Sequence, residues 1–321
     1  MGPGDDELAR LKFLYRQVCY IRKVELLISD KYHEQKMRCP VHLSIGQEAV
    51  AVGLLTGVPA SHRKVISAHR SHAHYLAAGG DLESMFAELM GKATGCASGY
   101  GGSMHLIDHS AGFVAAVPIV GSSIPIAVGF SMADKIRAKS DVTFVFLGDG
   151  ATEEGAFFES LDLAVLNKLN IIFVVEDNKF SVYTHKTIRQ SPQRSLESIC
   201  KGMGLSYHFI SSADASEINQ NFGHIMANKT GPLLIEIPTY RYLEHCGPNN
   251  DDHLNYRAES EVKYWKENDP IQILEERLLS IDCQQKDWLE VTQTELDAII
   301  WNAWDKADQA DLNTNIGLEY V

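Results

Sequence analysis

The sequence contains no apolar run of the roughly 18 residues that a membrane-spanning helix needs, and it contains no run of basic residues. Asp and Glu number 42 against 29 Lys and Arg, which gives a formal net charge of −13. A chain this acidic is a poor match for nucleic acids and for anionic membranes. We therefore expect neither as a partner.

Paired cysteines are also missing. The six cysteines occur singly, without a Cys-x-x-Cys spacing, which predicts reduced thiols in a cytosol-like compartment. The N-terminal stretch MGPGDDELARLKF has neither an apolar signal core nor an Arg- and Ser-rich transit pattern. We expect a cytoplasmic protein, with the mature form of an organelle-matrix protein as the alternative.

What the sequence does contain is a strand-helix-strand pattern between Asp141 and Phe180. Val142–Leu147 and Ile171–Val175 are short apolar runs rich in β-forming residues, which is typical of strands buried in a parallel sheet. Apolar residues between them recur at helical spacing, namely Phe157, Leu161, Ala164, Val165 and Leu169. The pattern predicts an α/β fold, a mostly parallel sheet with helices on both faces.

Polar residues follow both of these strands. Gly148-Asp149-Gly150 follows the first and Asn178 the second, and a right-handed crossover places both at the sheet edge where open α/β sheets bind ligands. A carboxylate, an amide oxygen and a backbone carbonyl just beyond suit Mg²⁺. The glycines and the free N–H groups of a helix start at Ala151–Gly155 admit a phosphate. The predicted ligand is a Mg²⁺-diphosphate.

A second polar cluster, HRSHAH from His69 to His74, follows the strand predicted at Val65–Ala68. Alternating histidines also suggest metal binding, but no carboxylate or cysteine lies near enough in sequence to complete a site. We prefer anion recognition with Arg70 as the main cation, and we interpret His74 as structural.

Two expectations concern the segments around this cluster. Ser44 is placed to cap a helix that contains Glu48, and Glu48 is interpreted as a first-turn residue stabilised by the helix dipole rather than as a proton carrier. The glycine-rich stretch Gly91–Leu106 is either flexible or an ordered loop whose backbone reaches a cofactor. We expect the ordered loop.

Three further segments bear on the site. Small residues in the helix predicted within Ala115–Lys139 indicate either a close crossing with another helix, for example of a second copy, or burial beneath the sheet. The polar and basic segment Thr187–Gly202 is expected to cover the site. His245 follows the strand predicted at Leu233–Ile237, so it can lie at the same sheet edge.

Helical patterns mark both ends of the chain, from Asp6 to about Tyr32 and from about 259 onward. Neither an internal repeat nor a linker interrupts the sequence between them. We expect residues 1–321 to form a single domain with an N-terminal helix and a C-terminal helical extension at about 259–321.

With these pieces in order, the chain resembles the alpha subunit of the thiamine-diphosphate-dependent first component of 2-oxoacid dehydrogenases, the pyruvate, branched-chain and acetoin group. The resemblance covers roughly Leu8–Ala310 and is carried by HLSIGQEA, GCASGYGGSMH, PIVGSSIP, GDGATEEGAFFESLDLAVLNKL, EDNKF, TYRYLEH and NDPIQILEERL. It implies the thiamine-diphosphate-binding fold. It also implies decarboxylation of a 2-oxoacid and onward transfer of the acyl group, with the hard chemistry carried by the cofactor.

The resemblance also implies roles for single residues. Mg²⁺ would be held by Asp149, Asn178 and the carbonyl oxygen of Phe180. His245 matches an active-site loop histidine and is the expected catalytic residue, in contact with the diphosphate or the intermediate. The other cofactor-binding residues would be His69, where relatives have Tyr or His, Val120 at the aminopyrimidine, and Arg70, Gly150 and Ala151 at the diphosphate.

One part of the family's active site is missing from this chain. In the family, a glutamate that activates the pyrimidine ring comes from a separate beta subunit, and no second α/β domain here provides it. We therefore expect an α₂β₂ heterotetramer, with the chain inactive alone. A 2-oxoacid is the expected substrate, and the lipoyl domain of an acyltransferase is the candidate acceptor.

Two departures from the family pattern keep alternatives open. Asp177 stands where the motif has its first Asn and adds negative charge near the metal, which motivates a non-catalytic member. Leu243-Glu244-His245-Cys246 replaces His-Gly-His-Ser, so a serine that is phosphorylated in some relatives is absent. The changed loop motivates a carboligase that transfers the acyl group to a carbonyl acceptor.

Overall fold

The computed structural model describes residues 3–314. At its centre is a six-stranded sheet in which every pair of neighbouring strands is parallel, in the order β2-β1-β3-β4-β8-β7. The strands are β1 (Arg63–Ser67), β2 (Phe113–Ala116), β3 (Val142–Gly148), β4 (Ile171–Asp177), β7 (Ser206–Phe209) and β8 (Leu233–Pro238). The predicted α/β fold is confirmed, and its central unit is β3, α6 (Gly155–Leu166) and β4.

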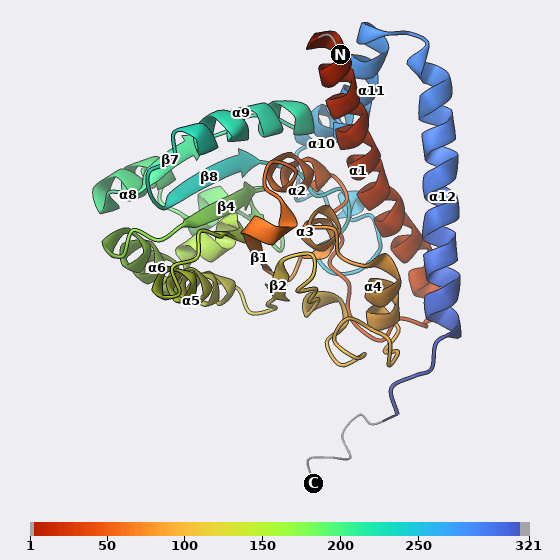
Figure 1. The fold of residues 1–321 in the computed structure, drawn as a ribbon, viewed down its shortest axis with the longest axis horizontal. Coiled ribbons are helices and arrows are strands. Elements are labelled where there is room, and N and C mark those ends of the chain that lie inside the picture. The colour runs from red at the N-terminus through yellow and green to blue at the C-terminus, as the bar shows by residue number, and fades with distance from the viewer. Residues whose placement is uncertain (1–2, 315–321) are drawn as a thin grey trace.

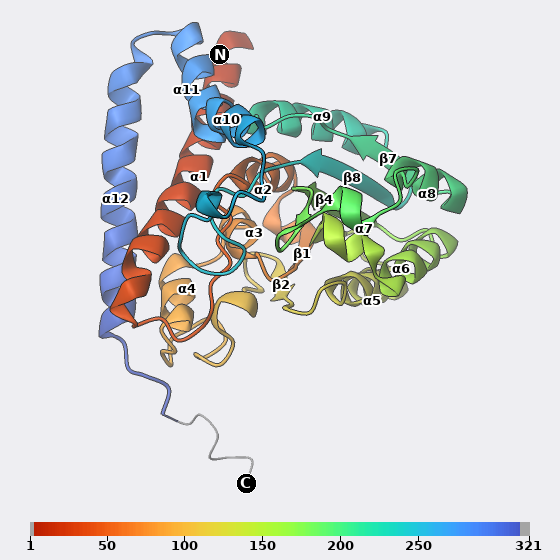
Figure 2. The ribbon, with the colours of Figure 1, turned by 180° about the vertical axis from the view of Figure 1, so that it is seen from behind.

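Helices cover both faces of the sheet (Figures 1 and 2). One face carries α5 (Ser123–Ile136), α6 and α8 (Leu196–Met203). The other carries α2 (Glu48–Leu55), α3 (His72–Ala77) and α9 (Ala215–Ala227), while α1 (Pro3–Lys31) packs outside this layer and α4 (Leu82–Leu89) packs against α12. The chain closes with α10 (Glu259–Glu267), α11 (Pro270–Ile281) and α12 (Gln285–Gln309).

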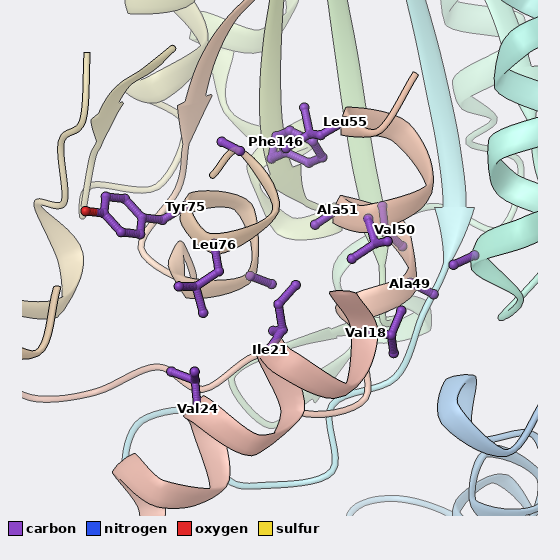
Figure 3. Close-up of a cluster of buried hydrophobic side chains, with 14 of the residues drawn as sticks. Val18, Ile21, Val24, Ala49, Val50, Ala51, Leu55, Tyr75, Leu76 and Phe146 are labelled. Carbon is purple, nitrogen blue, oxygen red and sulfur yellow. The ribbon is translucent and has the colours of Figure 1, made fainter. Parts of the chain in front are cut away.

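Successive side chains of β3 alternate between two apolar cores. Phe144 and Phe146 enter the core shared with α1, α2 and α3, whereas Val145 and Leu147 enter the core shared with α5 and α6. Figure 3 shows the first of these cores. A strand buried on both faces must be apolar at every position, because each side chain left in water forfeits roughly 1.5–3 kcal/mol. This is why the strand reads as a continuous apolar run.

The two longest helices, α1 and α12, lie side by side beyond the end of the sheet (Figures 1 and 2). Both fall where the helical patterns predicted helices, and the single-domain assignment stays a prediction. Residues 1–2 and 315–321 of that assignment lie outside the described residues. Across residues 3–314, no helix is both long enough and apolar enough to span a bilayer.

The start of α2 differs from the sequence prediction. The helix begins at Glu48, so Ser44 does not cap it; the backbone N–H of Ser44 instead donates to the buried carboxylate of Glu25. Glu48 is fully buried, where it pairs with Arg22 and accepts from the backbone N–H of Gly46 at 3.0 Å. Its role is structural, as expected, but an arginine from α1 stabilises it more directly than the helix dipole does.

The glycine-rich loop is ordered around one carboxylate. Glu88 accepts from the backbone N–H groups of Ala97, Gly99, Gly101 and Gly102 at 2.7 to 3.0 Å. Four amides can converge on two oxygens only if the chain folds back closely on itself: a Cβ on Gly99, at φ +79°, would lie 2.7 Å from a backbone atom of the 91–92 turn. The glycines therefore serve this internal turn.

Candidate active site

All nine residues singled out from the sequence line one cavity of about 130 Å³ at the carboxyl ends of β1, β3 and β4. They are His69, Arg70, Val120, Asp149, Gly150, Ala151, Asn178, Phe180 and His245. The parallel register explains the meeting of the central residues, because Gly148 of β3 lies opposite Glu176 of β4 and both chains turn immediately afterwards. No residue between Gly91 and Leu106, all of which the structure describes, lines the cavity. The expectation that this loop reaches a cofactor therefore stays a prediction for the part of the site that this cavity does not enclose.

The oxygen ligands predicted for Mg²⁺ lie on two adjacent turns. Asp149 opens a 3₁₀ turn, Asp149–Glu153, and is 2% exposed, while Asn178 follows β4. The side-chain oxygen of Asn178 accepts from the backbone N–H of Phe180 at 2.9 Å, which orients the amide. Burial, together with the nearby charge of Asp177, raises the pKa of Asp149. A cation at this carboxylate would relieve both effects.

Arg189 supplies that positive charge in this structure. It lies on the one-turn helix α7 (Lys186–Arg189) and pairs with both Asp149 and Glu153. The segment Thr187–Gly202 thus reaches a predicted metal ligand through Arg189, although none of its residues, all of which the structure describes, lines the cavity. The later residues form α8, whose Leu196 and Cys200 pack into the apolar core beneath the sheet.

Asp177 does not line the cavity, although its charge acts on Asp149. One of its carboxylate oxygens accepts from the backbone N–H of Lys179 at 2.9 Å, and the other accepts from the ammonium of Lys186 at 2.6 Å. Lys186 also lies 3.5 Å from the carboxylate of Glu236. The extra negative charge thus has its own cationic partner in Lys186, while part of its field still reaches Asp149.

The opposite wall of the cavity is basic and aromatic. Arg70 is 9% exposed and donates to the carbonyl oxygens of Leu43 at 2.6 Å and His245 at 3.0 Å. Burial and the charge of Arg241 lower its pKa, yet a guanidinium so held stays protonated at neutral pH. Hydrogen bonds to these two carbonyl oxygens fix the position of the Arg70 guanidinium, and its remaining N–H groups are available to bind an anion.

Three histidines meet beside Arg70. The ring of His42, which the sequence reasoning missed, lies 4.8 Å from that of His69 and 5.3 Å from that of His245, centroid to centroid. Burial, reinforced by neighbouring positive groups, lowers the pKa of His42 to about 2, of His69 to about 3 and of His245 to about 4. All three imidazoles are therefore neutral at physiological pH.

The other two histidines of the HRSHAH segment are packed into the fold. His72 is fully buried between the carboxylate of Glu25 (2.6 Å) and the hydroxyl of Ser103 (2.7 Å). His74 stacks on Phe146 with ring centroids 4.0 Å apart, although its edge reaches the cavity. The structural interpretation of His74 agrees with this packing.

The side chains of the cavity and the open backbone at the 149–153 turn suit the binding of a Mg²⁺-diphosphate. The 149–153 turn passes so close to Ser181 that a Cβ on Gly150 would lie 3.1 Å from the Ser181 hydroxyl, whereas a Cβ on Gly148 would meet nothing within 4 Å. Val120 lies in a turn closed by the Ser122 N–H donating to the Ile119 carbonyl at 3.1 Å, and its side chain is 48% exposed. The site thus offers oxygen ligands, a fixed cation and open backbone in one place.

Sequence reasoning missed His42, Lys186 and Arg189. The only signal for the lysine and the arginine was the basic character of their region, which did not identify the carboxylates that they pair with. His42 carried no signal, because its partners His69 and His245 lie far away along the chain.

Comparisons with known proteins agree with this geometry. The family described as Dehydrogenase E1 component matches residues 16–315. The chain is 33% identical over 317 residues to pyruvate dehydrogenase E1 component subunit alpha-1, mitochondrial, of Oryza sativa subsp. japonica, covering 96% of this chain and 80% of that protein. It is 32% identical over 268 residues to pyruvate dehydrogenase E1 component subunit alpha of Rickettsia felis, covering 83% and 81%. The corresponding mitochondrial subunit of Pisum sativum is 33% identical, covering 96% and 78%.

Proposed function

The chain belongs to the dehydrogenase E1 component family, as the alpha subunit of a thiamine-diphosphate-dependent 2-oxoacid dehydrogenase, and we propose that it holds Mg²⁺ and the diphosphate of that cofactor in the cavity at the ends of β3 and β4. One observation carries the proposal. Nine residues drawn from a stretch as long as His69 to His245, at the positions that match the family's motifs, line the same cavity.

Different groups of the cavity would bind the metal ion and the diphosphate. Asp149, Asn178 and the carbonyl of Phe180 would hold Mg²⁺, and Arg70 with the backbone at Gly150 and Ala151 would hold the diphosphate. When bound, thiamine diphosphate supplies the carbanion and the electron sink for decarboxylation of a 2-oxoacid. Since Arg189 occupies the carboxylate of Asp149, this arginine would have to withdraw as the metal binds.

His245 is suited to move a proton at Nε2. The guanidinium of Arg70 lies 3.5 Å from its Nδ1, which favours the tautomer with the proton on Nε2. The lowered pKa keeps the ring neutral, so Nε2 can donate a hydrogen bond without placing a second full charge beside Arg70.

The cavity needs a partner to become a complete site. At about 130 Å³ it is smaller than the roughly 300–1,000 Å³ of typical small-molecule pockets, so this chain would enclose only part of the cofactor. Apolar side chains are exposed near Val120, with Ile119 71%, Ile126 39% and Phe130 37% exposed. We propose that the beta subunit covers this surface in an α₂β₂ heterotetramer and completes the pocket.

The family match favours the dehydrogenase over the carboligase, and the Asp177–Lys186 pair argues against a non-catalytic member. Pyruvate is the first 2-oxoacid to test, with a lipoyl domain as acceptor. A cytoplasmic or organelle-matrix location stays a prediction.

Decarboxylation by the chain co-expressed with its beta subunit tests the proposal. A panel of 2-oxoacids and an artificial electron acceptor would be used with and without Mg²⁺ and thiamine diphosphate. We expect turnover only when both are present and only in the complex. A stable complex that fails to bind thiamine diphosphate in calorimetry would overturn it.

A further inference from the structure

We propose that His42, His69 and His245 form a second metal site, separate from the Mg²⁺ ligands, that binds a transition-metal dication of the Zn²⁺ class at the basic wall of the cavity. The binding itself does not depend on the proposed function. The consequence, that the bound ion blocks the cavity, rests on that function.

The three imidazoles form a compact triangle. Their ring centroids are 4.8, 5.3 and 5.4 Å apart, and one ring nitrogen of each lies within 4.8 Å of those of the other two. They come from three separate segments, which precede α2, follow β1 and follow β8. A backbone bridge between His42 and Gly247, with the Gly247 N–H donating to the Val41 carbonyl at 2.9 Å, ties two of these segments together.

The nitrogens are ready to bind a metal. A metal takes the unprotonated nitrogen of a neutral imidazole, and burial keeps all three rings neutral at physiological pH. In the favoured tautomer of His245 that nitrogen is Nδ1, so the metal would displace its 3.5 Å contact with the Arg70 guanidinium. The Nδ1 atom of His42 is buried and has no hydrogen-bond partner among the described residues. A buried nitrogen left unpaired costs roughly 1–3 kcal/mol, and a metal ion would satisfy it.

Three nitrogen ligands with an open fourth position are typical of Zn²⁺ and its neighbours rather than of Mg²⁺, which prefers oxygen. At Zn–N distances of about 2.0–2.1 Å, tetrahedral ligands lie roughly 3.4 Å apart, so the triangle would contract by up to about 1.5 Å. His245 lies on a partly buried loop two residues before Gly247, at φ +122°, and the contraction would have to move this loop against its hydrogen bonds to Val41 and Arg70.

The surrounding charge limits the affinity. Arg70 touches His245, and Arg241 lies close enough to act on the same ring, so both oppose a dication. Glu25 and Glu176 face Arg70 and offset part of this field. We expect micromolar binding of Zn²⁺, which is weaker than in a structural zinc site.

Occupation of the site would close the cavity. His69, His245 and Arg70 all line it, and all three are residues proposed to bind the cofactor, so an ion on the triangle would compete with thiamine diphosphate for them. Inhibition by Zn²⁺ would be reversed by a chelator.

Titration of the purified alpha–beta complex with Co²⁺, in excess Mg²⁺ and without thiamine diphosphate, tests the binding. We expect one Co²⁺ per alpha chain, with visible absorption bands of tetrahedral Co²⁺ and displacement by Zn²⁺. Each of His42→Ala, His69→Ala and His245→Ala should weaken binding by roughly tenfold or more. His42→Gln, with circular dichroism of every variant, separates lost ligation from lost folding.

Matched controls locate the ion. His224→Ala and His253→Ala remove exposed histidines outside the triangle, Cys246→Ser removes the neighbouring thiol, and Asp149→Ala removes the Mg²⁺ ligand. All four should bind Co²⁺ as the unchanged complex does. Absence of saturable binding, or equal binding by the triple His→Ala variant, would overturn the proposal. If the complex binds Co²⁺ but never turns over a 2-oxoacid, the proposed function fails and the metal site stands.

Discussion

The two walls of the cavity are stabilised in opposite ways. On the carboxylate wall, Asp149 and Asp177 pair with Arg189 and Lys186 from one short helix, so each charge is balanced by a side chain that can be exchanged for another cation. On the histidine wall, Arg70 is fixed by backbone carbonyls and the imidazoles are neutral. Binding of Mg²⁺ at the first wall would therefore be an exchange of cations, whereas at the second wall the groups are already positioned for a ligand.

The largest effect is expected from Asp149→Ala on the carboxylate wall. The change removes the only full negative charge among the predicted Mg²⁺ ligands, so the affinity of the alpha–beta complex for thiamine diphosphate should fall by more than roughly 100-fold in calorimetry with Mg²⁺. Asp162→Ala, which removes an exposed carboxylate from α6, is the matched control and should bind normally. Normal binding by Asp149→Ala would place the metal elsewhere.

Lys186→Met should destabilise the fold, because it leaves Asp177 facing Asp149 and Glu236 without a counter-charge. Both side chains are partly exposed, so we expect a loss of about 1–2 kcal/mol in the free energy of unfolding rather than the larger cost of a fully buried pair. Denaturant unfolding measures it. The double variant Lys186→Met/Asp177→Asn should recover most of the loss; no recovery would mean that Lys186 acts through packing.

Mild acid should weaken the histidine wall. The folded pKa values of His42, His69 and His245, at about 2, 3 and 4, lie below the unfolded value near 6.5, so the unfolded chain takes up protons first. Stability is then complete above pH 6.5 and falls as the pH drops toward these folded values, by roughly 1 kcal/mol per buried ring between pH 6.5 and 5.5. Unfolding free energies measured across this range should fall less steeply for His42→Asn. If the unfolding free energy of His42→Asn fell with pH as steeply as that of the unchanged protein, His42 would have the same pKa in the folded and unfolded states.

The smallest effect is expected from Arg189→Ala, which removes the competing cation. Mg²⁺ should then activate the complex at a concentration roughly three- to tenfold lower, since a largely buried ion pair, whose Coulomb attraction is mostly offset by desolvation, no longer has to break. Arg189→Lys should lie between, and Arg137→Ala, an exposed arginine at the end of α5, should change nothing. A requirement for more Mg²⁺ in Arg189→Ala would indicate that this arginine binds the diphosphate.

Local sequence determined the core of the fold and the cavity residues that follow β3 and β4. The apolar period marks β3, α6 and β4, because a strand buried on both faces and a helix packed on a sheet impose different spacings on their apolar residues. Gly148 to Gly150 and Asn178 follow those strands directly, so the topology of a parallel sheet is enough to bring them together.

Only the tertiary structure decided which groups these residues meet. The apolar periodicity of the sequence does not predict four of these contacts. They are the pairing of Lys186 with Asp177, the convergence of His42 on His69 and His245, the hydrogen bond of Ser44 to Glu25, and the closure of the glycine loop on Glu88. Most of these contacts join segments that are distant along the chain. Their geometry is set by how helices pack on the sheet, because a buried charge or imidazole takes whichever partner the packing places beside it.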